Sequence, residues 1–523
     1  MLPALVATSL EPMAETSKTF EKVLIANRGE ITVRILRTLR ELGKRSAVIY
    51  SDADRASLSV LLADEAYRIG PAPSAQSYLR AQAVVDLAVS IGADAVHPGY
   101  GFLAENAGFA ELCGEAGLKF IGPPPKAMAA MGSKIESRRL MIGAGVPVVP
   151  GGEDALESLE EAARFAEEIG YPVMLKASAG GGGKGMRLVE SPGGLESAYR
   201  AARSEAKASF ADDTVYLEKF VQDPRHVEIQ ILADEHGRVI SLGERECSLQ
   251  RRHQKVVEEA PSPAVDADLR RRMGEAAVRA AEAVGYTNAG TVEFLLDPSG
   301  DFYFLEMNTR LQVEHPITEM VTGVDLVRAQ IAIAEGEPLD PELEGRTPRG
   351  HAFEVRLYAE DPYRNFAPSP GRIERLRLPE GPGVRNDCGV YEGDEVTIYY
   401  DPMLAKLIVW GASRDEAMDR LGRALSELRV DGIRTTAPLY QALLADDDFR
   451  AGRLDNGMLD RKLAAGELEP PATRYGKELA AIAAALEHMD RHGRRAAAAR
   501  PHGQRDHWRE AGRREALRGS RWN

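Results

Sequence analysis

Four consecutive glycines, Gly180–Gly183, lie between two lysines, Lys176 and Lys184. A glycine backbone has no Cβ atoms, so its N–H groups can approach a polyanion closely, and such nests bind phosphate well. The lysines would supply the countercharge. A flexible surface hairpin without a ligand is the alternative. The Walker pattern does not fit, because Ser178 occupies the position of its first glycine.

A second segment is predicted to form a β-hairpin. Its strands are Thr291–Leu296 and Phe302–Asn308, joined by the turn residues Asp297–Asp301. The two-residue period of a strand puts Glu306 and Asn308 on one face. The other face is expected to point to the core and carries Tyr303, Leu305 and Met307.

Folding this hairpin brings Glu293 beside or diagonal to Glu306. Two carboxylates and the amide oxygen of Asn308 on one face would repel one another unless a cation lies between them. Hard oxygen ligands of this kind suit Mg²⁺ that is shared with a phosphate substrate. Solvated hairpin carboxylates are the alternative.

The same strand is expected to continue through Arg310-Leu-Gln-Val-Glu314, with Arg310, Gln312 and Glu314 on one face. A guanidinium and an amide could hold a small planar anion while the carboxylate removes its proton. An ordinary salt-bridged edge strand is the commoner meaning of such a segment in isolation. A further polar and basic cluster, Gln250–Lys255, is by itself typical of a solvated face.

Alternating strands and helices must position these residues. Before residue 132 the predicted strands are Val23–Ala26, Ala47–Tyr50, Ala93–His97 and Phe120–Ile121, with a helix over Ile31–Leu42. This β-α-β spacing indicates a parallel sheet covered by helices. Farther on, strands at Tyr171–Lys176 and Met186–Glu190 enclose the glycines, which predicts a hairpin lid.

The third part of the chain mixes short strands with helices. The predicted strands are Glu354–Tyr358, Val396–Tyr400 and Leu404–Val409, and the predicted helices are Arg414–Leu428 and Thr436–Ala445. After Pro471, an apolar stripe at helical spacing comprises Leu479, Ile482, Leu486 and Met489. Ten arginines follow from Arg491 onward.

Composition narrows the class of protein. The chain has 523 residues, 44% of them hydrophobic and 28% charged, which predicts a globular protein of several domains. A net charge of −14 gives no electrostatic reason to bind nucleic acid, and no apolar run is long enough to cross a membrane. Three scattered cysteines indicate reduced thiols and a cytoplasmic location. Residues 1–18 have neither the basic start of a secretory signal nor the arginines of a transit peptide, and Met13 could be the true start.

Together these segments resemble the biotin carboxylase family of the ATP-grasp superfamily. The matching strings keep their order along the chain over about residues 20 to 465, with small departures at Glu246 and Leu249. They are Ile25–Ile31, His97–Phe102, Lys176–Met186, Arg225–Gln230, Cys247–Pro261, Glu306–Thr318 and Glu354–Asp361.

The resemblance implies an α/β fold with a Rossmann-like N-terminal domain, an ATP-grasp domain with a mobile glycine-loop lid, and a mixed α+β C-terminal domain. With the patterning it predicts a disordered extension at 1–18, an N-terminal domain at 19–131, and an ATP-grasp domain at 132–335. The lid would span about 149–220, the C-terminal domain 349–465, and a helical, arginine-rich extension 470–523.

It also implies residue roles. The expected ATP contacts are Lys134, Lys176, Gly182, Gly183, Glu218, Lys219, Phe220, Val221, His226, Gln250 and His253. The expected metal ligands are Glu293, Glu306 and Asn308. The expected bicarbonate contacts are Lys255, Arg310, Gln312 and the backbone of Val313. Glu314 resembles the general base, Arg310 joins it as a catalytic residue, and Arg356 would steady the biotin enolate beside Tyr100 and Gly101.

The implied activity is that of an ATP-dependent C–N ligase that carboxylates biotin with bicarbonate and uses two ions of Mg²⁺ or Mn²⁺. No Ala-Met-Lys-Met acceptor motif occurs in the chain. We therefore expect biotin on a separate carrier protein, a separate carboxyltransferase, and a homodimer serving an acyl-CoA carboxylase of fatty acid metabolism. The final carboxyl acceptor cannot be read from the sequence. The alternatives are another ATP-grasp ligase, such as a carboxylating purine-pathway enzyme or half of a carbamoyl-phosphate synthetase, and a non-catalytic scaffold whose arginine-rich tail binds nucleic acid or an acidic partner.

Overall fold

The computed structural model describes residues 19–152, 156–177, 186–210, 212–252, 254–469 and 481–489. Contacts divide the chain into two units, Met1–Glu469 and Pro470–Asn523. Several predicted features lie outside the described residues: the extension 1–18, the loop glycines Gly182 and Gly183, the loop lysine Lys184, His253, and, in the C-terminal extension, Leu479 and the arginines from Arg491 onward.

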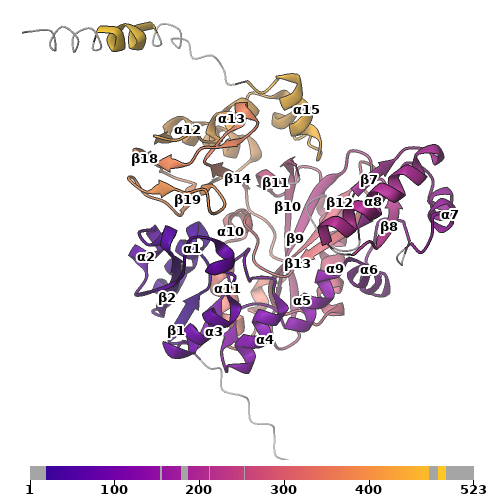
Figure 1. The fold of residues 1–523 in the computed structure, drawn as a ribbon, viewed down its shortest axis with the longest axis horizontal. Helices are drawn as coiled ribbons and strands as arrows, with labels where there is room; N and C mark the ends of the chain where they lie inside the picture. The colour runs from indigo at the N-terminus through magenta and orange to yellow at the C-terminus, as the bar shows by residue number, and fades with distance from the viewer. Residues whose placement is uncertain are drawn as a thin grey trace, which may run out of the picture. The chain divides into compact units, whose positions relative to one another are not determined.

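A five-stranded parallel sheet forms the start of the first unit, as the sequence predicted (Figure 1). Its order is β3 (Glu65–Gly70), β2 (Arg45–Ser51), β1 (Lys22–Ile25), β4 (Ala95–His97) and β5 (Lys119–Phe120). Val23 and Ile25 pack with α1 (Gly29–Glu41) and α11 (Leu326–Ala334) on one face, and Leu24 packs with α3 (Ala81–Ser90) and α4 (Ala107–Glu115) on the other. Because both faces are covered, β1 is apolar throughout rather than alternating.

An eight-stranded antiparallel sheet carries most of the predicted site. Its order is β13 (Phe302–Asn308), β12 (Asn288–Leu296), β9 (Arg225–Ala233), β10 (Val239–Arg251), β11 (Gln254–Ala260), β14 (His351–Tyr358), β21 (Met403–Gly411) and β19 (Val384–Cys388). Strand β11 pairs directly with β14, from Val257 opposite Val355 to Ala260 opposite Ala352. One sheet therefore continues across the region 335–349, where the sequence predicts a boundary between domains.

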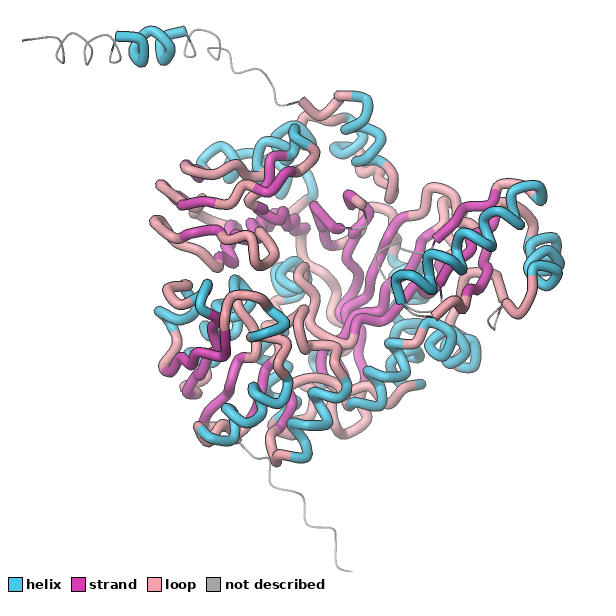
Figure 2. Tube along the Cα trace, viewed as in Figure 1, coloured by secondary structure: helices cyan, strands magenta, loops and turns pink. Residues whose placement is uncertain are grey.

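The lid is a smaller layer with its own core. Strands β7 (Met186–Val189), β6 (Val173–Ala177) and β8 (Val215–Lys219) form an antiparallel sheet, and Lys176 lies opposite Met186. Helices α7 (Leu159–Ile169) and α8 (Leu195–Phe210) pack with this sheet (Figure 2). The predicted hairpin around the glycine loop is confirmed.

The predicted hairpin over β12 and β13 is also confirmed, but its expected core face is partly wrong. Glu293 pairs with Glu306 and Phe294 pairs with Phe304, so Leu305 has no partner on β12. Such a bulge shifts the alternation by one residue. Phe304 consequently packs in the core with Met307, whereas Tyr303 and Leu305 are only half-buried.

Two further differences concern the end of the chain. Strand β20 covers only Glu395–Val396, so the predicted strand over 396–400 is mostly a loop. The helices α12 (Arg414–Glu427) and α13 (Ala437–Leu443) lie where they were expected. In the second unit, residues 481–489 are helical, and none of the described helices is both long and apolar enough to span a bilayer.

Candidate functional site

Lys255 on β11 is the centre of a cluster of charged side chains from separate strands. Its Nζ donates to Glu228 Oε2 of β9 at 2.5 Å, to Glu293 Oε1 of β12 at 2.9 Å and to Glu314 Oε1 at 2.6 Å. Burial opposes the charge of Lys255, but these three carboxylates outweigh it and raise the pKa of the lysine well above its usual range. The ammonium is therefore a fixed positive charge.

Glu314 is held between two cations at the start of α10 (His315–Thr322). Besides Lys255, it accepts from Arg356 Nη2 at 2.9 Å. Burial acts against ionisation of Glu314, but Lys255 and Arg356 lower its pKa well below the usual range. Arg356 is itself fixed by Glu258, whose Oε1 accepts from Nε at 2.7 Å. The carboxylate of Glu314 is thus ionised, and as long as both cations hold it, it is a weak proton acceptor.

The segment 310–314 is not the strand that the sequence predicted. Strand β13 ends at Asn308, and a turn leads directly into α10, which has Pro316 in its first turn. Proline favours that position, so the start of the helix overrides the alternating pattern. The turn nevertheless gathers the side chains. Arg310 donates to Glu105 Oε2 at 3.0 Å, to Asn308 Oδ1 at 3.0 Å and to Gln312 Oε1 at 2.9 Å.

The three predicted metal ligands lie next to one another. Glu293 and Glu306 are directly opposite across the hairpin, and Asn308 Nδ2 donates to Glu293 Oε1 at 2.9 Å. Desolvation by the surrounding protein raises the pKa of Glu306, and the charge of Glu293 adds to this effect. Glu306 is nevertheless exposed toward solvent. His226, Glu228 and Glu293 also have ligand atoms within 4.8 Å of one another.

His226 links this carboxylate pair to the β10–β11 hairpin. Its Nε2 lies 2.9 Å from Glu293 Oε2, and its Nδ1 lies 2.8 Å from Gln250 Nε2. Burial lowers the pKa of His226, but Glu293 outweighs it and the net direction is upward. Gln250 and His226 were both predicted as nucleotide contacts, and the structure brings them together.

Most of the other predicted nucleotide residues lie near the lid. Lys176 forms an ion pair with Glu218 across the lid sheet. Lys134, at the start of α6 (Lys134–Gly143), has a pKa lowered by burial, although Glu306 partly offsets this. The Lys219 side chain instead bonds to the carbonyls of Gly170 and Tyr171 at 2.8 and 3.2 Å. Phe220 is half-buried and Val221 is buried where the chain leaves β8.

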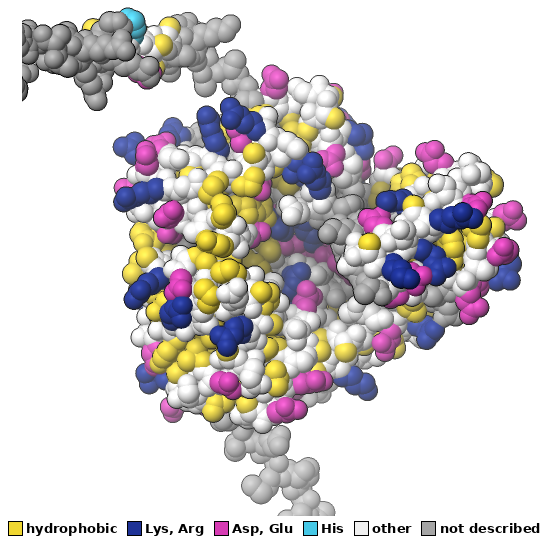
Figure 3. Space-filling model, viewed as in Figure 1, with side chains coloured by type: hydrophobic (Ala, Val, Ile, Leu, Met, Phe, Trp, Pro, Cys, Tyr) yellow, Lys and Arg dark blue, Asp and Glu magenta, His cyan; other side chains and the backbone are white. Residues whose placement is uncertain are grey.

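A cavity of about 510 Å³ opens beside these charges. Its lining includes Tyr100, Gly101, Arg310, Val313 and Arg356. Two of the predicted bicarbonate residues, Arg310 and Val313, therefore share this space with the predicted biotin residues, whereas Lys255 and Gln312 do not line it. Figure 3 shows the molecule hollowed between the lid and the rest of the unit, with acidic and basic side chains at the floor of the hollow.

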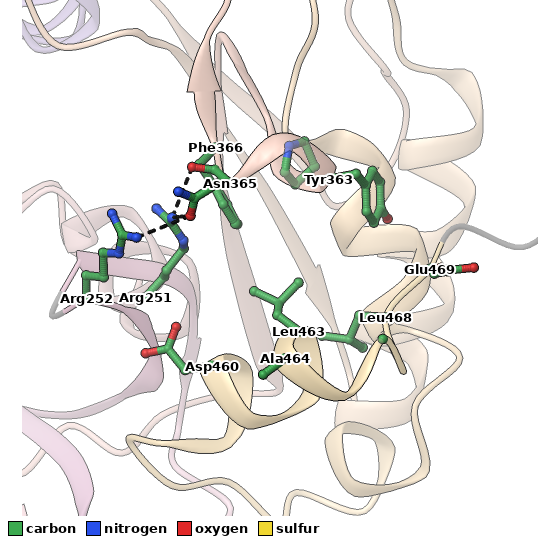
Figure 4. Close-up of a pocket in the computed structure, with 12 residues that line it drawn as sticks. Arg251, Arg252, Tyr363, Asn365, Phe366, Asp460, Leu463, Ala464, Leu468 and Glu469 are labelled. Carbon is green, nitrogen blue, oxygen red and sulfur yellow. Dashed lines mark hydrogen bonds between the residues drawn. The ribbon is translucent and has the colours of Figure 1, made fainter.

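A second cavity, of about 440 Å³, lies elsewhere and has a different character (Figure 4). Arg251 and Arg252 both donate to Asn365 there, and Arg251 stacks on Phe366 with its guanidinium 3.9 Å from the ring centroid. None of the predicted site residues within the described part of the chain lines it, and Asp460 and Glu469 balance its two arginines. We therefore take the cavity beside Arg356 as the functional one.

Some residues of the site were missed by sequence reasoning. Arg245 is fully buried and donates to Glu228 Oε1 at 2.5 Å, and the other oxygen of Glu228 accepts from Lys255. Lys406 is also fully buried, and its Nζ donates to Val313 O at 2.8 Å. Lys406 could have been recognised from the sequence, because it is a lysine within the otherwise apolar run of β21. The signal for Glu228 was its two-residue spacing from His226 on β9, which places both side chains on one face.

Comparisons with known proteins match family models along most of the chain. The family described as biotin carboxylase, N-terminal domain, matches residues 19–128. The family described as carbamoyl-phosphate synthase L chain, ATP binding domain, matches 133–342, and biotin carboxylase C-terminal domain matches 354–461.

Two similar relatives span most of the chain. Biotin carboxylase of Halalkalibacterium halodurans is 54% identical over 445 residues, which cover 85% of this chain and 98% of the relative. Biotin carboxylase of a Nostoc species is 52% identical over 440 residues, which cover 84% and 98%.

Solved structures are similar over the same length. The biotin carboxylase domain dimer of Hydrogenobacter thermophilus 2-oxoglutarate carboxylase, in complex with MgADP, ADP and bicarbonate, has a TM-score of 0.80 and 48% identity, covering 85% of this chain and 98% of that one. Campylobacter jejuni biotin carboxylase in a β-γ-ATP complex has a TM-score of 0.81 and 47% identity, covering 84% and 99%.

Proposed function

This chain belongs to the biotin carboxylase family, and we propose that its charged cluster joins ATP, bicarbonate and carrier-bound biotin in one pocket. It is an ATP-dependent ligase that carboxylates biotin. The observation that carries the assignment of the site is the convergence of Lys255, Glu293, Glu314 and Arg356 beside one cavity.

We propose that bicarbonate binds among Lys255, Arg310, Gln312 and the backbone of Val313. An anion there would replace the internal carboxylate partners of the two cations. Glu314 would take the bicarbonate proton, because an anion that replaces its contact with Lys255 removes a cation that lowers its pKa. The freed oxygen then attacks the γ-phosphorus, ADP leaves with the bridging oxygen, and carboxyphosphate forms.

The proposed metal ligands are Glu293, Glu306 and Asn308. Their fit rests on the donor set, in which two directly opposed carboxylates and an amide offer hard oxygens on one face. Mg²⁺ or Mn²⁺, with two ions in our proposal, would supply charge neutralisation on the phosphate oxygens. Asn308 and Gln312 already orient Glu293 by donating to its Oε1.

We assign ATP to the space between the lid and the large sheet. Lys134, Lys176 and His226 would contact its phosphates and ribose, and Gln250 would fix the ring of His226. The stretch Glu218–Val221 would line the base, with Lys219 acting through its backbone because its side chain bonds to lid carbonyls. Gly182, Gly183 and His253 keep their predicted nucleotide roles as proposals.

We assign biotin to the part of the cavity between Arg356 and the loop carrying Tyr100 and Gly101. Carboxyphosphate would break into CO₂ and phosphate, and the phosphate would take the N1′ proton of biotin. N1′ then attacks CO₂. Arg356 would offset the oxyanion that this deprotonation creates, a type of stabilisation typically worth about 3–4 kcal/mol.

The partners follow from this half-reaction. Biotin carboxylases serve larger carboxylase assemblies, and we propose a separate biotin carrier protein, a separate carboxyltransferase and a homodimer. The relative from Hydrogenobacter thermophilus is a dimer. Three buried cysteines, none of them in a disulfide among the described residues, support our proposal of a cytoplasmic location.

Release of ADP in the presence of bicarbonate, with and without free biotin, tests this function. We expect biotin to increase ADP release and 14C-bicarbonate to enter an acid-labile biotin adduct. If biotin changes neither signal, the proposal fails and another ATP-grasp ligase activity becomes the better assignment.

A further inference from the structure

Two large apolar side chains project next to the mouth of the biotin cavity. Ile398 is 77% exposed and Tyr399 is 53% exposed. Tyr399 lines the cavity, and Ile398 is its neighbour in the loop between β20 and β21. A single exposed apolar residue needs no explanation, whereas two adjacent ones beside a cavity are a candidate contact surface.

Tyr400, the residue after Tyr399, anchors this loop. Tyr400 hydrogen-bonds through its hydroxyl to Ser51 and to the carbonyl of Ala72. The Arg28 guanidinium lies 4.3 Å from the centroid of the Tyr400 ring, and Tyr78 packs edge-on at 5.5 Å. Ile398 and Tyr399 are therefore presented from a fixed position, which lowers the entropy cost of binding a partner.

The depth of the cavity restricts what can lie on this surface. Arg356 lines the same cavity but is only 8% exposed, whereas Tyr399 is exposed at its rim. A biotin ring bound at Arg356 would share the cavity with Tyr399, because both residues line one space. The protein that carries the biotin then covers the rim.

We propose that Ile398 and Tyr399 form a docking surface for the biotin carrier protein and contact apolar residues beside its biotinyl lysine. This inference rests on the proposed function of the cavity. It adds that the carrier is recognised by its own side chains as well as by biotin. Free biotin enters the same cavity without using Ile398, which does not line it.

Peptides that carry biotin on a central lysine test the proposal. One peptide has leucines on both sides of the lysine and the other has serines. We expect kcat/KM for carboxylation of the leucine peptide to be at least tenfold higher with the unaltered chain. The variant Ile398→Asp should lose this preference, while its activity with free biotin stays unchanged.

Leu61→Asp is the matched control. Leu61 is 62% exposed at the end of α2 (Leu58–Leu62) and does not line the cavity. This variant should keep the preference for the leucine peptide. Equal rates with both peptides in the unaltered chain, or a preference that survives Ile398→Asp, would overturn the proposal.

Two further outcomes are distinguishable. If the unaltered chain shows no stimulation by free biotin or by either peptide, the proposed function itself is wrong. If Ile398→Asp changes the sedimentation mass of the chain, the surface joins two copies of this protein, and the carrier proposal is refuted.

Discussion

Arg356 bonds to Glu258 and Glu314 at the same time, so it connects the proposed base, Glu314, to the cavity that we propose for biotin. We expect Arg356→Ala to reduce biotin carboxylation by about a hundredfold to a thousandfold, because the oxyanion of biotin loses its donor. Bicarbonate-dependent ATP cleavage should fall much less. Parallel assays of ADP release and carboxybiotin check this, and an equal loss in both would contradict the assigned role.

Glu306 is the exposed member of the opposed carboxylate pair. Replacing it with Gln keeps its shape and removes one anionic ligand. We expect the Mg²⁺ concentration for half-maximal ADP release to rise by about tenfold or more. The control Glu392→Gln changes a glutamate far along the chain, outside the cluster. An unchanged Mg²⁺ dependence would remove Glu306 from the ligand set.

Glu354 is a buried acid for which the sequence patterns predict no role. It is fully buried opposite Glu258, and neither of its oxygens has a hydrogen-bond partner among the described residues. Burial raises the pKa of Glu354 well above its usual value, Lys406 opposes this, and Glu258 adds to it. The folded state therefore holds the proton.

This raised pKa predicts how stability depends on pH. The stability that the bound proton gives is complete below about pH 4, where the unfolded chain is also protonated, and is lost as pH rises toward the folded pKa. Glu354→Gln cannot titrate, so its free energy of unfolding should increase relative to the unaltered chain, by up to about 1.4 kcal/mol per pH unit. Urea denaturation between about pH 5 and 8 measures the difference. A difference that does not change with pH would be evidence against a protonated Glu354.

At the scale of elements, the end of β19 meets the first turn of α1 without room for a side chain. A Cβ at Gly389 would lie 2.5 Å from the backbone N of Glu30 and 2.8 Å from the carbonyl carbon of Gly29. Gly29 and Glu30 also line the biotin cavity. We expect Gly389→Ala to lower the free energy of unfolding by about 1–3 kcal/mol and to raise the KM for biotin.

Denaturation and biotin kinetics check the Gly389 prediction. Gly132→Ala, at the end of α5 (Pro125–Gly132), is a suitable control because no atom lies within 4 Å of the added Cβ. Wild-type stability in Gly389→Ala would show that the two elements can separate at little cost.

The hairpin over β12 and β13 shows which features a local sequence pattern can predict and which it cannot. Alternation and turn residues predicted both strands and the meeting of Glu293 with Glu306, because these depend on neighbours in the chain. The bulge at Leu305 and the turn at Arg310–Glu314 were not predicted. The first is set by pairing with β12 and the second by the start of α10, and neither follows from a two-residue period.

At the scale of the whole first unit, the large sheet joins strands from before residue 335 and after residue 349. Sequence pattern could predict the strands but not this pairing, since their order depends on contacts far apart in the chain. Lys406 and Glu228 reach the site only through that order. The resemblance to family motifs predicted the remaining site residues. A motif assigns a role to a residue from its position in the sequence, so the strand order need not be known.

The continuous sheet predicts cooperative opening. Amide hydrogen exchange in β11 and β14 should show similar protection, because each strand loses its ladder when the other leaves. Exchange in the lid strands β6 and β8 should be faster, because the lid has a separate core. Mass spectrometry of the corresponding peptides tests this, and much faster exchange in β14 than in β11 would show that the sheet divides at the predicted boundary.

The bonds of Lys255 and Arg356 to internal glutamates also have a consequence for the use of ATP. Without a bound anion, Lys255 and Arg356 are both paired with glutamates of the chain itself, and this pairing weakens Glu314 as a base. In the mechanism that we propose, a bound anion would have to replace those glutamates before Glu314 could act as a base. Under that mechanism ATP would be cleaved only when bicarbonate is bound, so little nucleotide would be lost when bicarbonate is scarce.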